Sequence, residues 1–79
     1  MELSDSAITK IVSQITNRLG LEGLISAHHP ANRDNVVVIQ IRSKPLVEFE
    51  MASDATEHEI RRKTEQEIIR AQAEATRIK

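Results

Sequence analysis

The stretch VVVIQIRSKPLVEFEM, residues 36–51, decides the fold of this 79-residue chain. Its first half is dense in β-branched residues, and its second half alternates apolar with acidic residues, as strands do. A turn at Ser43-Lys44-Pro45 places Ile41 opposite Val47, Ile39 opposite Phe49 and Val37 opposite Met51. All of these side chains are apolar, whereas the other face pairs Gln40 with Glu48. The pattern predicts an antiparallel hairpin with one buried face, and a shift by one residue would mix the two faces.

An amphipathic helix precedes this hairpin. Its apolar residues recur at the spacing of one helical face, and they are Ile8, Ile11, Val12, Ile15 and Leu19. Ser4 or Ser6 can cap the start, and Gly20 can end the helix in the left-handed conformation with Leu21 as the apolar contact. The segment Leu24–His28 is compatible with a short strand, but its pattern leaves that assignment open.

The chain closes with a long, charge-rich helix. Asp54 and Glu57, and likewise Thr56 and Glu59, have the spacing of a capping box. Glu57–Arg61 and Glu59–Lys63 stand at the distance of intrahelical ion pairs. About 25 helical residues would span roughly 37 Å, which exceeds the roughly 20–23 Å of the hairpin strands.

The apolar residues of this last helix form a narrow stripe close to a heptad seam, made of Ile60, Thr64, Ile68, Ala71, Ala75 and Ile78. We expect the first half of the stripe, around Ile60 and Ile68, to pack on the hairpin. Residues 70–79 are then predicted to form a projecting or dimer-forming end.

These elements predict a single small α+β domain over residues 1–79. Its order is helix, short strand, β-hairpin and long helix, with both helices on one face of a small antiparallel sheet of two or three strands. This order resembles the topology of double-stranded RNA-binding domains. It is also similar to the helix–hairpin–helix order of small phage head-to-tail joining proteins.

The composition predicts a thin core. Only 39% of the residues are hydrophobic, Phe49 is the one aromatic residue, and there is no cysteine. A chain of this size buries only roughly 60% of its unfolded surface, and such small domains often gain stability by oligomerising. We therefore expect a homodimer.

The pattern of polar residues argues against an enzyme and against a bound cofactor. There is no cysteine nucleophile, and with only Gly20 and Gly23 there is no phosphate-binding loop. Adjacent side chains of a strand point to opposite faces, so His28 and His29 are poorly placed to share a metal ion. Glu48 and Glu50 alternate with apolar residues on the predicted wet face, which favours a solubilising role.

The leading hypothesis is therefore a protein–protein interaction module, such as a small regulator, an inhibitor or an assembly factor of a phage or bacterial kind. Two sets of apolar residues are candidates for partner binding. The helix stripe consists of Ile68, Ala71, Ala75 and Ile78, and the outer strand strip consists of Val36, Val38 and Leu46.

The alternative is a nucleic-acid-binding module that uses the basic cluster Arg61, Arg62 and Lys63. The formal net charge of -1 argues against a strongly basic nucleic-acid binder. Four glutamates also surround the cluster.

The sequence contains no segment that predicts membrane insertion. The longest aliphatic run is VVVI at 36–39, far below the roughly 20 residues of a membrane-spanning helix. The first residues lack the basic and apolar regions of a signal peptide. We expect a soluble, cytoplasmic protein.

Overall fold

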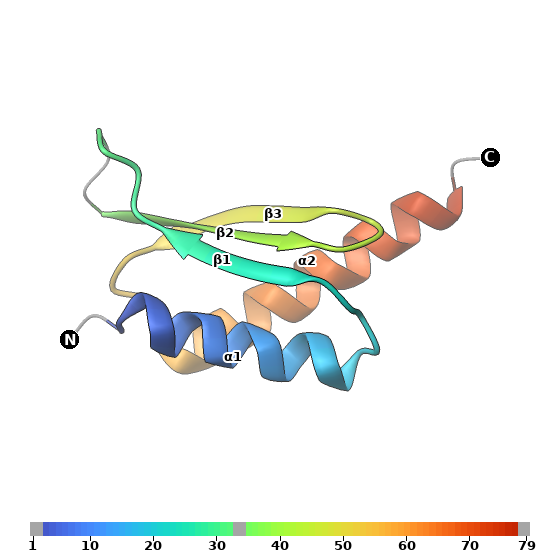
Figure 1. Cartoon of the computed structure of the whole chain (residues 1–79), viewed down its shortest axis with the longest axis horizontal. Helices are drawn as coiled ribbons and strands as arrows, with labels where there is room; N and C mark the ends of the chain where they lie inside the picture. The colour runs from blue at the N-terminus through green and yellow to red at the C-terminus, as the bar shows by residue number, and fades with distance from the viewer. Residues whose placement is uncertain (1–2, 33–34, 78–79) are drawn as a thin grey trace.

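The computed structural model describes residues 3–32 and 35–77. Its elements are α1 (Asp5–Arg18), β1 (Leu24–His28), β2 (Val36–Arg42), β3 (Val47–Ala52) and α2 (Glu57–Arg77). The three strands form one antiparallel sheet in the order β1-β2-β3. Both helices lie on the same face of this sheet (Figure 1). The predicted α+β fold is confirmed. Residues 24–28, whose assignment the sequence left open, form the strand β1, so the sheet has three strands.

The hairpin has the predicted register. Ile41 pairs with Val47, Ile39 with Phe49 and Val37 with Met51. The inner-face side chains of β2 are almost fully buried, and Val47 and Phe49 of β3 are buried beside them. Met51 is only half-buried. Because side chains alternate along a strand, the apolar face of the hairpin lies in the core.

The ends of α1 are fixed by local hydrogen bonds. The Ser4 hydroxyl accepts a hydrogen bond from the backbone N–H of Ala7 at 3.1 Å, so Ser4 is the N-cap. At the other end Gly20 has a φ of 72°, a value that suits glycine. The Leu21 N–H then donates to the Thr16 carbonyl at 2.9 Å, which is the hydrogen bond of a Schellman cap. Leu21 is buried, as the apolar contact predicted from the sequence requires.

The two helices run in parallel and form the second layer of the fold. The Arg61 guanidinium donates to the Gln14 side-chain oxygen at 2.7 Å, and one turn further along Arg18 pairs with Glu65. Helix α1 contacts β1, whereas α2 contacts β3. The core lies between the layers and is almost entirely aliphatic.

The structure shows which of the two capping boxes suggested by the sequence is formed at the start of α2. Thr56, not Asp54, shares reciprocal hydrogen bonds with the residue three positions later, Glu59. Because Glu59 is engaged in the cap, Lys63 pairs instead with Glu67, at 3.2 Å. The expected Glu59–Lys63 pair is therefore wrong, whereas Arg61 pairs with Glu57 at 2.9 Å as expected.

Candidate interaction surfaces

Helix α2 is longer than the sheet that it covers. Figure 1 shows it running past the turn between β2 and β3. Ile60, Thr64 and Ile68 are its buried residues, Ala71 is half-buried, and residues 73–77 are exposed. The change from buried to exposed residues falls within about one turn of the helix. Helix α2 therefore has a first part covered by the sheet and an uncovered C-terminal end.

The predicted helix stripe is therefore divided by the structure. Ile68 has 0% exposure and belongs to the core of its own chain, so a partner cannot reach it while the fold is intact. Ala71 is half-buried and Ala75 is exposed. Ile78 lies outside the described residues. The part of the stripe that is accessible in the structure is Ala71 and Ala75.

The residues of the outer strand strip do not form one continuous strip. Val36 and Val38 are half-buried on the open face of the sheet, where Val38 lies between His28 and Glu50. Leu46 is 58% exposed and lies beside the turn at the other end of β2. The paired residues Gln40 and Glu48 separate it from the two valines.

Leu46 instead lies close to the end of α2. A shallow hollow of about 200 Å³ is lined by Leu46, Val47, Glu48, Glu67, Arg70, Ala71 and Glu74. One residue of the predicted outer strip and one residue of the predicted helix stripe thus share a surface. Leu46, Ala71 and Ala75, which we call the helix-end patch, have charged residues around them.

The basic cluster is largely neutralised within the chain. Arg61 is held by Glu57 and Gln14, and Lys63 is held by Glu67. In the described residues, Arg62 is the one member of the cluster without an ion pair. These contacts reduce the positive potential that a phosphate backbone would meet.

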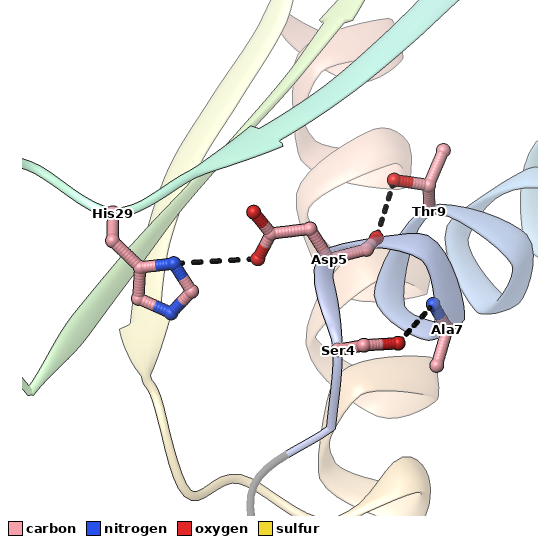
Figure 2. Close-up of polar contacts among 5 residues, drawn as sticks. All are labelled: Ser4, Asp5, Ala7, Thr9 and His29. Carbon is pink, nitrogen blue, oxygen red and sulfur yellow. Dashed lines mark hydrogen bonds and ion pairs between the residues drawn. The ribbon is translucent and has the colours of Figure 1, made fainter.

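The predicted histidine arrangement is seen at the end of β1. His28 lies on the open face of the sheet, whereas the Nδ1 atom of His29 lies 3.3 Å from the Asp5 carboxylate at the start of α1 (Figure 2). Figure 2 also shows that the Ser4 hydroxyl points to Ala7, away from His29. The contact therefore joins the residue that follows β1 to the start of α1. Over residues 3–32 and 35–77, no group of three or more His, Cys, Asp or Glu side chains could hold a metal ion.

A second and larger hollow lies between the end of α1 and the β2–β3 turn. It has a volume of about 780 Å³, and its lining residues are Asn17, Gly20, Leu21, Glu22, Arg42, Ser43, Lys44 and Leu46. Lys44 and Arg42 form no ion pair with any residue that the structure describes. The lining of this hollow therefore carries both signs of charge, from Arg42, Lys44 and Glu22, next to the exposed Leu46.

Sequence reasoning missed two exposed apolar residues, Leu24 and Ile69. Leu24 is 75% exposed and is paired with Arg42, and Ile69 is 52% exposed on α2. An assignment of residues 24–28 as a strand would have placed Leu24 on the outer face by alternation. Ile69 stands beside the stripe, so the helical period alone indicates its exposure.

Comparisons with known proteins give no match: no family model, curated protein or solved structure resembles the chain significantly. A search of the described helices for one long and apolar enough to cross a membrane finds none.

Proposed function

We propose that this protein is a non-enzymatic protein–protein interaction module that acts as a homodimer. The proposed cellular role is that of a small cytoplasmic regulator, inhibitor or assembly factor, of a phage or bacterial kind. One observation carries the proposal: α2 continues beyond its own sheet, and its core-facing stripe continues there through Ala71 to the exposed Ala75.

The helix-end patch has the features of a contact surface. Alanine side chains allow two helices to approach closely. Leu46 adds a large apolar side chain that is more than half exposed. The rim contains both signs of charge, because Arg70 and Glu74 pair with each other at 3.7 Å beside the hollow. The hollow itself is mostly polar, so Leu46 and the two alanines supply the apolar part of the patch.

The experiment is a measurement of mass over a range of concentrations by sedimentation equilibrium. The wild-type chain is expected to be a dimer. Ala75→Glu should give a monomer because it places a charge on the proposed contact. Ala73→Glu is the matched control, since residue 73 lies on the opposite side of α2 and either glutamate stands four positions before a basic residue.

A monomeric wild-type chain at every concentration would refute the homodimer. An equal loss of the dimer in both variants would refute the assigned face. Leu46→Glu tests the second element of the helix-end patch and should also weaken the dimer. Ile68→Asp is unsuitable for this purpose, because it would place a charge in the core.

Nucleic-acid binding through Arg61, Arg62 and Lys63 has less support, because two of these side chains are already paired with glutamates. A salt titration separates the two functions. Binding to nucleic acid that weakens steeply with salt, and fails when all three residues become alanine, would favour the alternative.

A further inference from the structure

The free edge of β1 lacks the devices that normally protect a sheet edge. None of its five residues is Asp, Glu, Lys, Arg or Pro. Its pairing with β2 advances by one residue at every step, from Leu24 opposite Arg42 to His28 opposite Val38, so it has no bulge. Natural proteins usually protect an edge with charge, proline or a bulge. The other edge strand, β3, carries Glu48 and Glu50 and is in contact with α2.

The inner face of β1 is also incompletely covered. Ile25 and Ala27 point toward the helix layer but remain half-buried, whereas Ile39 and Ile41 of the neighbouring strand have 0% exposure. At the edge and open face of the same strand, a hollow of about 350 Å³ is lined by Leu24, Ile25, Ser26 and Arg42. Apolar surface and unpaired backbone groups are thus exposed along the same edge.

The two layers differ in width. Packed helices lie roughly 8–10 Å apart, and each helix is roughly 10–12 Å wide with its side chains, so two helices cover about 20 Å. Neighbouring strands are about 4.8 Å apart, so the three strands of this sheet cover only about 14 Å. Two packed helices are thus wider than the three strands, and β1 is one of the two edges at which a further strand can be added.

The helices also decide what can occupy this place. A second copy that paired through its own β1 would bring its α1 with it. Each α1 lies against its own β1 (Figure 1). In an antiparallel β1–β1 pair, which keeps both helix layers on one face, strands about 4.8 Å apart would therefore force the two helices closer than the roughly 8 Å that packed helices need. An extended segment without a helix beneath it meets no such obstacle.

Charge adds a preference to this geometry. Arg42 lies on the open face, next to Leu24 across the β1–β2 pair, and its Nε–H donates to the Gln40 side-chain oxygen at 3.5 Å. A carboxylate on the added strand, placed opposite Leu24, would lie within reach of the long Arg42 side chain and would provide a charged hydrogen-bond partner.

We propose that β1 accepts an extended segment of a partner protein as the fourth strand of the sheet. The segment alternates apolar residues, which face Ile25 and Ala27, with polar residues, and it carries an acidic residue beside Leu24 and Arg42. This proposal rests on the proposed protein-binding function, which supplies the class of partner. Its surface, the edge of β1, is separate from the helix-end patch.

The test uses the ¹⁵N-labelled full chain and the peptide acetyl-Thr-Val-Thr-Val-Glu-amide, titrated into the millimolar range by NMR. Antiparallel pairing places its glutamate opposite Leu24 and its valines opposite Ile25 and Ala27. The amide signals of residues 24–28 are expected to shift, and their hydrogen exchange should slow. Two further peptides carry proline either at the central threonine or at the valine after it. At least one of them should not bind, because alternate residues of an antiparallel strand donate to the neighbouring strand and proline removes that donor.

A charge reversal examines the role of Arg42. The wild-type chain should prefer the glutamate peptide to one ending in lysine by roughly two- to fivefold, as for an exposed ion pair. Arg42→Glu should reverse this preference. Lys10→Glu changes an exposed cation on α1 and should leave the preference unchanged.

Absence of any shift at residues 24–28 in the millimolar range would overturn the proposal, and so would shifts confined to α2. Self-association of the peptide-free chain that protects β1 would also overturn it, because the occupant would then be a second copy. A chain that binds the peptide while sedimenting as a monomer would keep this proposal and refute the homodimer. A chain that sediments as a dimer and does not bind the peptide would refute this proposal and keep the homodimer.

Discussion

Thr56 and Glu59 hold each other at the first turn of α2. The Thr56 backbone N–H donates to Oε1 of Glu59 at 3.0 Å, and the Glu59 N–H donates to the Thr56 hydroxyl oxygen at 3.2 Å. The Thr56 hydroxyl in turn donates to the same carboxylate oxygen at 3.1 Å. The hydrogen bonds from the Thr56 backbone and side chain lower the pKa of the Glu59 carboxyl below its usual value.

This lowered pKa predicts a loss of stability in acid. Ionised Glu59 stabilises the folded chain fully above the unfolded-state pKa of about 4.3. That contribution falls as the pH drops below this value and is lost once the pH passes through the folded-state pKa. Melting curves of the wild-type chain and of Glu59→Gln between neutral pH and pH values below about 4.3 check it. The difference between the two should shrink as the pH falls, and a difference that is constant with pH would contradict the prediction.

Removing the cap residue should destabilise the chain at neutral pH. Thr56→Ala is expected to cost about 0.5–2 kcal/mol, the usual range for loss of an N-cap side chain. Urea unfolding monitored by circular dichroism gives the value. Asp54→Ala is the control, because Asp54 belongs to the alternative capping box that the structure does not use, and it should change stability much less.

Thr64 offers a stabilising substitution. It is fully buried in α2, and its hydroxyl is a buried side-chain group without a hydrogen-bond partner among the described residues. Thr64→Val keeps the branched shape and removes the unsatisfied hydroxyl, so the free energy of unfolding should rise by about 1 kcal/mol. Thr76→Val is the contrast, since that hydroxyl donates to the Gln72 carbonyl at 2.9 Å near the exposed end of α2. A less stable Thr64→Val chain would show that the hydroxyl has a partner in solution.

The adjacent isoleucines of α2 should respond very differently to truncation. Ile68 is 0% exposed and Ile69 is 52% exposed. Ile68→Ala should cost about 2–5 kcal/mol through lost burial and a cavity, which is a large part of the stability of so small a domain. Ile69→Ala should change stability by less than about 0.5 kcal/mol. Thermal melting of both variants measures the difference, and similar losses would show that the Ile69 side chain is covered in solution.

Gly23 is required by close packing of two backbones. A Cβ atom at this position would lie 2.6 Å from the carbonyl oxygen of Arg42. Gly23→Ala should therefore cost about 1–3 kcal/mol, the range for overpacking, and should loosen the β1–β2 pair. Hydrogen exchange of residues 24–28 reports the second effect. Gly20→Asn is the comparison: Gly20 has open space around it, and asparagine tolerates its positive φ.

The hairpin was the most predictable part of the fold because alternation restricts its register to one choice. β1 was left open because five residues carry too little periodicity to separate a strand from a loop. Residues 24–28 form a strand because they pair with β2. That contact lies outside the short window that a local sequence pattern covers. The choice of cap was ambiguous for a similar reason, since both candidate pairs have the same spacing.

The candidate surfaces were less predictable than the fold. A helical stripe shows which side of α2 is apolar, but it contains no information on where the sheet beneath it ends. Ile68 and Ala75 therefore looked equivalent in sequence, although one is core and the other is exposed. The proximity of Leu46 and Ala71 was equally hidden, because it depends on how α2 crosses the hairpin.

The parallel pairing of α1 and α2 has a consequence for synthesis on the ribosome. Gln14 and Arg61, which meet across the helix layer, are 47 residues apart. At roughly 5–20 residues per second, the partner of α1 is translated about 2–10 s after α1 itself. During that interval the apolar side of α1 has no helix beside it, and the nascent chain depends on the early hairpin, or on a chaperone, to shield it.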